Sequence, residues 1–262
     1  MTEGSVTEGA MTEGGTAQPA TTAVRPGGTG DPANAVSTAP GTPNPALAEK
    51  PPTGPDSVVE VKPVTPPETP TPAASSPALL DPALATEKAP DAYRVKLETS
   101  KGDIVIQVTR ASAPHGADRF YNLVKIGFYD GVRFFRVFPD ELAQFGISGN
   151  PAVSEKWKRA KFPDDPPVKS NVRGSISMAK VIDSENSATT QVFINIGDNP
   201  EYDKDGFTPF GMISEGLDVV GRLTSEYGDK GPSSTHILEK GNSFLLANFP
   251  KLDFIKKATI VE

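Results

Sequence analysis

Few side chains in this sequence are suited to covalent or metal chemistry. His115 and His236 are its two histidines, there is no cysteine, and neither histidine has a second ligand at metal-binding spacing. Ser187, in the stretch SENSATT, lacks the histidine and aspartate that activate a serine nucleophile. We therefore predict no hydrolase, no metal site and no cofactor, and we expect both histidines to face solvent or to form local hydrogen bonds.

Aromatic residues are confined to one part of the chain. All 13 Phe, all 5 Tyr and the single Trp lie after residue 90, whereas residues 1–90 hold 17 of the 27 prolines amid Thr, Ala and Gly. Such a composition cannot bury enough apolar surface to offset the entropy of the chain. We predict a disordered Pro/Thr/Ala-rich tail and linker over 1–90 and a folded domain over 91–262.

The charge is also unevenly distributed. Residues 1–90 carry a net charge of −6 and the remainder −1, so the domain lacks the basic surface that nucleic acids require, and we expect no nucleic-acid partner. Without a signal sequence or an apolar run of about 18 residues, the chain is predicted to be soluble and cytoplasmic. MTEG occurs at both Met1 and Met11, which leaves an upstream start, and with it a cell-envelope or periplasmic location, as an alternative. Nothing in the pattern requires more than a monomer.

Short alternating segments dominate the second part of the sequence. YRVKLET and IVIQV flank a Gly-containing turn and predict a β-hairpin, and further β-rich runs follow at RFFRVF, GSISMA, QVFINI and FTPFGMI. Residues 112–128 predict an amphipathic helix that begins near Pro114, and EGLDVVGRL predicts a second helix. The final IKKATIV predicts a closing strand. Two helices that cap a closed antiparallel barrel are the simplest assembly of these elements.

In its order of motifs the sequence resembles the cyclophilin-type peptidyl-prolyl cis-trans isomerases, over residues 93–262. The matching segments are ETSKGDIVIQV, FYDGVRFFRV, RGSISMA, TTQVFIN, FGMISEGLDVV and KKATIVE. QFGISGNP and DDPPVKSN are similar to a bacterial branch of the family. The resemblance implies a mainly β fold, a closed eight-stranded antiparallel barrel capped by two α-helices.

The chemistry that the resemblance implies is rotation about an X-Pro amide, with no covalent intermediate. The barrier of about 18–20 kcal/mol comes from the double-bond character of the C–N bond, and about 7 kcal/mol of it must be removed for efficient turnover. Rotation frees the lone pair of the prolyl nitrogen, so a guanidinium aimed at that nitrogen stabilises the twisted amide. By resemblance, Arg136 in FFRVF is this catalytic arginine.

The resemblance also implies a substrate-binding set that provides an apolar socket for the proline ring, a donor for the carbonyl and an adjoining groove. Core packing is the alternative role for Phe193 and Leu142. The predicted set is Phe135, Glu141, Leu142, Gln144, Ala179, Gln191, Phe193, Tyr202 and Phe207.

Several of these positions depart from the family pattern. In PDELAQ, Glu141 stands where the family usually has a pocket phenylalanine, and an ionised carboxylate near Arg136 would compete with the substrate for the guanidinium. Tyr202, preceded by Glu201, stands where a leucine is common. Phe207 and Phe135 each stand at or near a position that often holds a histidine.

We therefore predict a prolyl isomerase that assists protein folding. A weakly active or inactive peptide-binding module or chaperone is the alternative, because Glu141 replaces an aromatic residue. The expected partners are unfolded or flexible segments that contain X-Pro, the chain's own Pro-rich tail at an effective concentration of about millimolar, and, by resemblance, cyclosporin-like ligands.

Overall fold

The computed structural model describes residues 76–261, and most of the predicted tail lies outside that range. Eight strands form one antiparallel sheet in the order β3-β4-β6-β5-β7-β2-β1-β8. The strands are β1 (Ala92–Thr99), β2 (Gly102–Thr109), β3 (Arg136–Phe138), β4 (Leu142–Phe145), β5 (Ser175–Met178), β6 (Val192–Asn195), β7 (Pro209–Glu215) and β8 (Ile255–Val261). The predicted eight-stranded antiparallel architecture is confirmed.

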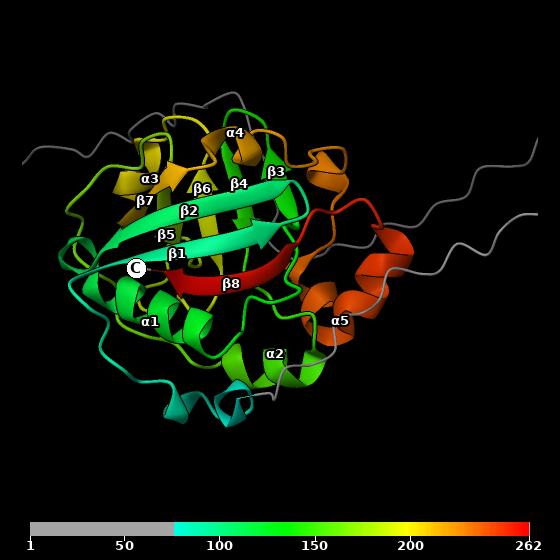
Figure 1. The fold of residues 1–262 in the computed structure, drawn as a ribbon, viewed down its shortest axis with the longest axis horizontal. Helices are drawn as coiled ribbons and strands as arrows, with labels where there is room; N and C mark the ends of the chain where they lie inside the picture. The colour runs from blue at the N-terminus through cyan, green and yellow to red at the C-terminus, as the bar shows by residue number, and fades with distance from the viewer. Residues whose placement is uncertain (1–75, 262) are drawn as a thin grey trace, which may run out of the picture. The chain divides into compact units, whose positions relative to one another are not determined.

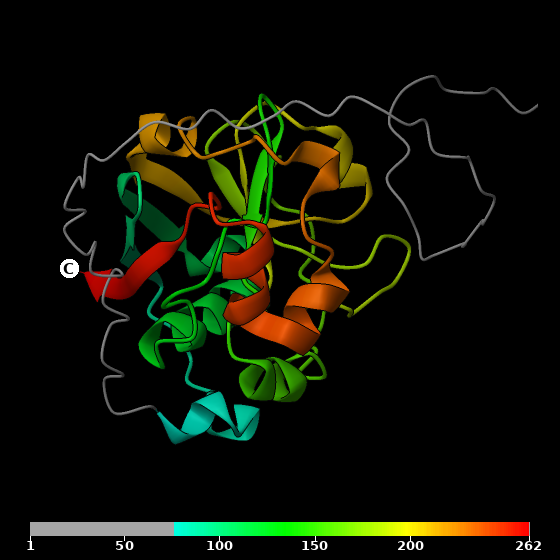
Figure 2. The same cartoon turned by 90° about the vertical axis from the view of Figure 1, so that its right-hand side faces the viewer.

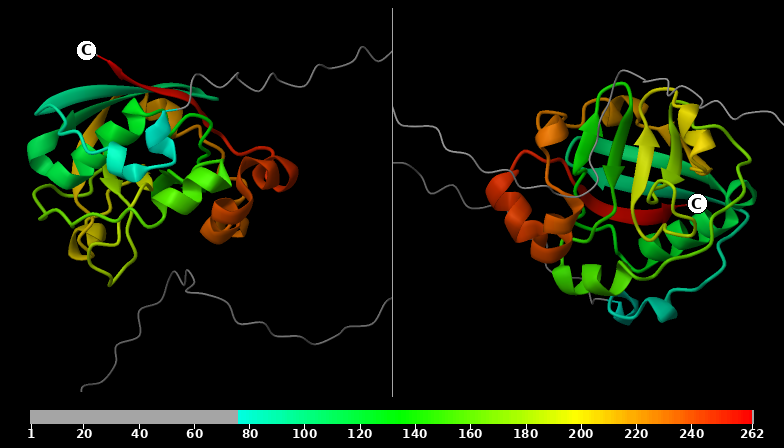
Figure 3. Two further views of the ribbon diagram at one scale, coloured as in Figure 1. Left: turned by 90° about the horizontal axis from the view of Figure 1, so that it is seen from below. Right: turned by 180° about the vertical axis from the view of Figure 1, so that it is seen from behind.

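The longest strands form one side of the sheet. β1 pairs with β2 through a hairpin in which Thr99 faces Gly102, and β8 pairs with the other edge of β1 (Figure 1). The shorter strands lie behind them in Figure 1 and in front of them in the rear view of Figure 3. The two ends of the sheet approach each other at a single antiparallel bridge between Arg133 and Phe254, which precede β3 and β8. The sheet is therefore curled, and its ends meet at this bridge instead of along a continuous ladder.

The helices differ from the prediction in number. They are α1 (Pro114–Lys125), α2 (Pro151–Trp157), α3 (Glu201–Lys204), α4 (Leu217–Val220) and α5 (Ser234–Asn248), with 3₁₀ turns η1 (Pro77–Leu79), η2 (Pro82–Leu84), η3 (Arg110–Ser112) and η4 (Gly228–Lys230). α1 confirms the predicted amphipathic helix and contacts β7 and β8. The second predicted helix is only the single turn α4, and α2, α3 and α5 were not predicted. No helix within the described range is long and apolar enough to cross a membrane.

The main core fills the space between the sheet and α1. Its largest fully buried side chains are aromatic and include Phe120, Tyr129, Phe145, Trp157 and Phe210. Phe120 lies 5.0 Å from Phe210 between ring centroids, so α1 and β7 are joined by direct aromatic packing. Burial of aromatic side chains supplies much of the stability of such a core.

Residues 76–90, which the sequence analysis assigned to the tail and linker, pack on the domain. The indole Nε1 of Trp157 donates to the carbonyl of Leu79 at 3.0 Å, and the backbone NH of Ala89 donates to Asp118 at 2.9 Å. Asn122 accepts from the NH of Glu87 and donates to its carbonyl. We call residues 76–90 the strap; Figure 3 shows it beside α1 and α2.

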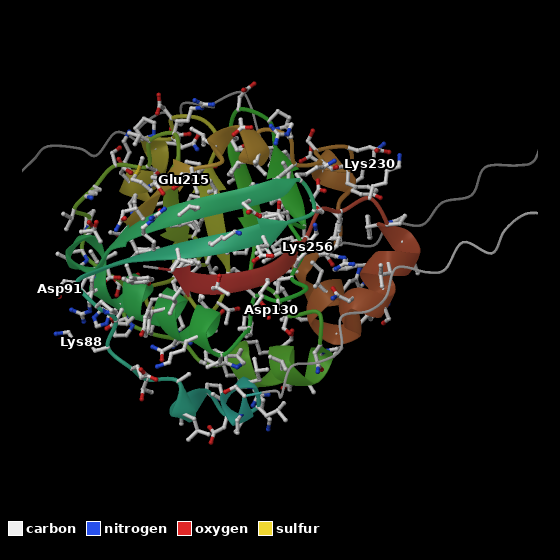
Figure 4. The ribbon with its side chains drawn as sticks, in the orientation of Figure 1. Lys88, Asp91, Asp130, Glu215, Lys230 and Lys256 are labelled. Carbon is white, nitrogen blue, oxygen red and sulfur yellow. The ribbon has the colours of Figure 1, made fainter. Side chains whose placement is uncertain are left out.

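The strap leads directly into β1, and Lys88 and Asp91, which precede this strand, lie at one edge of the domain (Figure 4). On the same face Asp130, which follows α1, accepts a hydrogen bond from the backbone NH of Ala258 in β8 at 2.9 Å. Burial raises the pKa of the Asp130 carboxyl above its usual value. This contact joins the segment that follows α1 to the last strand.

Candidate functional site

The predicted catalytic arginine lies on the hairpin formed by β3 and β4. Arg136 and Gln144 are paired across the two strands, and Gln144 is paired with Phe193 on β6. Alternation along a strand places every second side chain on one face, so this register gathers the three residues on the same side of the sheet.

The polar groups of this face form a short chain of hydrogen bonds. Nη1 of Arg136 lies 3.4 Å from Oε1 of Gln144, and Nε2 of Gln144 donates to Oε1 of Gln191 at 3.0 Å. The guanidinium also lies over the ring of Phe138, with Cζ 4.8 Å from the ring centroid. Arg136 is exposed, so its charged end is oriented by neighbours and still accessible to a ligand.

A small apolar cluster adjoins this chain and is separate from the main core. Leu142, Phe193 and Phe207 are 4%, 3% and 8% exposed, and Phe138, Ala179 and Tyr202 pack against them. The rings of Phe193, Tyr202 and Phe207 lie 5.4–5.7 Å apart in edge-to-face contacts. Ligand sites are lined mainly by apolar and aromatic side chains with a few polar groups beside them, and this cluster beside Arg136, Gln144 and Gln191 has that composition. We call these six residues the apolar socket.

Glu141 lies in the turn between β3 and β4, at the edge of the apolar socket. The hydroxyl of Tyr202 donates to its carboxylate at 2.5 Å. Burial, and then the hydrogen bond to Glu141, raises the pKa of the Tyr202 hydroxyl far above its usual value. No ion pair joins Glu141 to Arg136 among residues 76–261. The expected competition for the guanidinium is therefore not observed, because the carboxylate is held by Tyr202.

The backbone of this turn is tightly held. Asp140 has a left-handed conformation, with φ of 62°, which Asp tolerates better than most residues. The carbonyl of Glu141 accepts hydrogen bonds from the NH of Ile196 and Gly197 and from the side chain of Asn199. A Cβ on Gly197 would lie 1.9 Å from the carbonyl oxygen of Asp140, so only glycine permits this close approach.

Comparison with known proteins agrees with this geometry. Residues 94–240 match the family model described as cyclophilin type peptidyl-prolyl cis-trans isomerase/CLD. The chain belongs to the cyclophilin family. It is similar to peptidyl-prolyl cis-trans isomerase A of Dickeya dadantii, with 34% identity over 50% of this chain and 70% of that protein. A peptidyl-prolyl cis-trans isomerase of Acinetobacter baylyi is also 34% identical, over 51% of this chain and 75% of that one.

Solved structures support the fold. A cyclophilin type peptidyl-prolyl cis-trans isomerase of Cryptosporidium parvum has a TM-score of 0.50 at 20% identity, covering 65% of this chain and 98% of that one. The likeness concerns the fold alone. Together with the family match it confirms the cyclophilin fold that the sequence motifs predicted.

Phe135 is the one predicted substrate-binding residue that this cyclophilin domain places elsewhere. Its side chain is 6% exposed and packs in a second cluster with Ile147, Ile237, Leu245 and Leu252. Three of these residues belong to α5 or to the segment that follows it, and Figure 2 shows α5 against this side of the domain. Because α5 was not predicted, the burial of Phe135 beneath it could not be foreseen.

A cavity of about 250 Å³ extends the site on the side of Gln191. Its lining combines apolar and polar groups and includes Trp157, Lys158, Lys161, Thr190, Gln191 and Leu238. Gln191 was predicted to line an adjoining groove, and it does line this cavity. Ala179, predicted for the same groove, belongs instead to the apolar socket, where it packs with Leu142, Phe193 and Phe207. The lysines and the wall that α2 contributes are features that the sequence reasoning missed.

The two histidines belong neither to the apolar socket nor to the hydrogen-bonded chain of Arg136, Gln144 and Gln191. The backbone NH of His115 donates to Asp165 at the start of α1, and the ring of His236 lies 5.4 Å from that of Phe244 on α5. Within residues 76–261 no group of three or more His, Cys, Asp or Glu side chains is arranged to hold a metal ion.

Proposed function

We propose that this cyclophilin is an active peptidyl-prolyl cis-trans isomerase that acts on X-Pro bonds in flexible protein segments. The observation that carries the proposal is the exposed guanidinium of Arg136 beside the apolar socket, held by Gln144 on the neighbouring strand. The family membership supports it, since the isomerases of Dickeya dadantii and Acinetobacter baylyi are relatives.

The reaction requires only noncovalent interactions. The proline ring would occupy the apolar socket between Leu142, Phe193 and Phe207, and the amides of Gln144 and Gln191 would position the peptide. As the C–N bond twists, the prolyl nitrogen becomes pyramidal and its lone pair becomes an acceptor for Arg136. Because this hydrogen bond is available only in the twisted state, it lowers the barrier instead of strengthening ground-state binding.

A second candidate function is favoured by Glu141. A carboxylate in place of an aromatic side chain reduces the apolar contact that the socket offers to a proline ring. The domain would then be a peptide-binding module or chaperone with little turnover. The bond between Glu141 and Tyr202 argues against this alternative, because the carboxylate accepts from Tyr202 and forms no ion pair with Arg136 among residues 76–261.

The test measures catalysed cis-trans exchange by NMR on a panel of X-Pro peptides, with the full chain, Arg136→Ala and Glu141→Phe. An isomerase shows turnover that falls by about two orders of magnitude in Arg136→Ala and leaves the circular dichroism spectrum unchanged. Equal turnover by wild type and Arg136→Ala would exclude the proposed mechanism. Peptide binding without turnover, with turnover restored by Glu141→Phe, would establish the binding module.

A further inference from the structure

The carboxylate of Glu141 has capacity for a further partner. An ionised carboxylate has about four acceptor positions, and within the described part of the chain the Tyr202 hydroxyl is the single side-chain donor to Glu141. None of the ion pairs there includes this residue. Glu141 is half-buried, so its negative charge is only partly screened by solvent.

Hydrogen bonds to both the backbone and the side chain of Glu141 fix the position of its charge. The turn backbone is held by three hydrogen bonds to the Glu141 carbonyl, and the side chain is held by Tyr202, which packs against Phe193 and Phe207. A peptide whose proline enters the apolar socket must therefore pass a carboxylate at the socket's edge. A cationic side chain close to that proline gains a partner, whereas an anionic one is repelled.

The sequence of this chain contains matching ligands. Before residue 91 there are four basic residues, and three of them directly precede a proline, as Arg25-Pro26, Lys50-Pro51 and Lys62-Pro63. None of the 22 basic residues after residue 90 does so. These dipeptides all precede residue 76, where the described chain begins. Three residues later, the carbonyl of Leu79 accepts a hydrogen bond from Trp157. Trp157 lines the same cavity as Gln191.

We infer that Glu141 makes this cyclophilin selective for Lys-Pro and Arg-Pro bonds, including those of its own N-terminal segment. The inference rests on the proposed function of the same site. From Lys62 to Ser76 the chain can span up to about 45 Å when extended, and tethering supplies an effective concentration of about millimolar. A separate protein with the same dipeptides would offer the same chemistry, and the two sources are distinguished below.

The first arm compares two peptides that differ only in a Lys or a Glu before the proline. Wild type should turn over the Lys-Pro peptide about three to five times faster than the Glu-Pro peptide, and the ratio should fall in 0.5 M NaCl. In Glu141→Gln, which keeps an acceptor for Tyr202, the ratio should approach one. Asp140→Asn removes a neighbouring charge as a matched control and should retain the preference.

The inference is overturned if wild type shows no preference or if Glu141→Gln keeps it. If wild type turns over neither peptide, the proposed function fails. Binding of the same peptides, followed by amide shifts of Phe193 and Gln191, then decides the inference: tighter binding of the Lys-Pro peptide, lost in Glu141→Gln, supports it, and equal binding overturns it.

The second arm uses the full chain with Arg25, Lys50 and Lys62 changed to Gln, and a control with Glu3, Glu8 and Glu13 changed to Gln. If the N-terminal segment occupies the site, the first variant shifts the amides of Tyr202 and Phe193, and the control leaves them unchanged. Unchanged amides in both variants overturn the intramolecular source, and the Lys-Pro ligand then belongs to another protein.

Discussion

Nη1 of Arg136 and Oε1 of Gln144 lie 3.4 Å apart on paired positions of β3 and β4. The amide of Gln144 is in turn bonded to Gln191, so it is held on two sides. Because the guanidinium is exposed, this contact and the ring of Phe138 beneath it are what limit its orientations. We therefore regard Gln144 as the residue that positions Arg136.

The first prediction concerns this contact. Gln144→Leu removes the acceptor while it keeps a similar volume, so Arg136 should lose its fixed orientation and kcat/KM for an X-Pro peptide should fall about tenfold. The change should appear mainly in kcat, measured by exchange NMR. Gln107→Leu on β2 is the matched control and should leave kcat/KM unchanged. Undiminished turnover in Gln144→Leu would show that Arg136 needs no support from this amide.

The second prediction concerns the hydroxyl of Tyr202. Its pKa is raised on folding by burial and by Glu141, so the neutral form is favoured in the native state. That stabilisation is complete below the unfolded pKa of about 10 and is lost as pH rises through the folded pKa. The free energy of unfolding should therefore fall with pH above about 10, and less steeply in Tyr202→Phe.

Denaturant titrations at several alkaline pH values measure these slopes. Part of the wild-type slope should remain in Tyr202→Phe, because burial also raises the pKa values of Tyr93 and Tyr129. Tyr227→Phe is the matched control, because Tyr227 packs against Phe249, outside the apolar socket. Identical slopes for wild type and Tyr202→Phe would contradict the raised pKa.

Much of the fold follows from local pattern. The hairpin of β1 and β2 is evident because β1 alternates between apolar and polar residues, β2 is rich in β-branched residues, and a Gly-containing turn joins them. α1 is evident from Pro114 and its apolar face. α5 is not evident, because Gly241 interrupts it with φ of 62° and only three of its residues are buried. A Cβ there would lie 2.2 Å from the carbonyl oxygen of Gly149, a contact that no local pattern reveals.

The strap and parts of the site depend on distant partners. The prolines of the strap suggest a linker, yet Pro77 and Pro82 begin the two 3₁₀ turns. Backbone NH groups of the strap donate to Asp118 and Asn122, about thirty residues away in the sequence. Glu141 and Tyr202 are 61 residues apart. Motif resemblance located both residues individually, but their hydrogen bond is a product of the fold.

The third prediction separates Phe135 from the site. Since Phe135 is buried beneath α5, Phe135→Ala should destabilise the protein by about 3–5 kcal/mol, and Phe135→Leu by less. At a temperature where Phe135→Leu is folded, its kcat/KM should stay within about twofold of wild type. Phe207→Leu, in the apolar socket, is the comparison and should lower kcat/KM. Selective loss of turnover in Phe135→Leu would return this residue to the substrate-binding set.

The fourth prediction concerns the anchor of the strap. Asp118 accepts from the NH of Ala89 and makes two hydrogen bonds with Arg110, each 2.8 Å long. Burial alone would raise the pKa of this carboxyl, but the bonds from Arg110 and Ala89 outweigh it, and the pKa lies below its usual value. Asp118→Ala should therefore destabilise the native state by about 2–3 kcal/mol.

The loss of this anchor in Asp118→Ala should be visible at the strap itself. Trp157, the single tryptophan of the chain, donates to the carbonyl of Leu79, so its fluorescence should change in Asp118→Ala before global unfolding. Glu87→Gln, which alters only an exposed pair with Lys125, is the control.

Because the native pKa of Asp118 is depressed, the contribution of this carboxylate to stability is present above the unfolded pKa of about 4 and is lost as pH falls through the native value. Wild type should thus lose more stability than Asp118→Asn on acidification, and parallel acid profiles would show that this carboxylate does not anchor the strap.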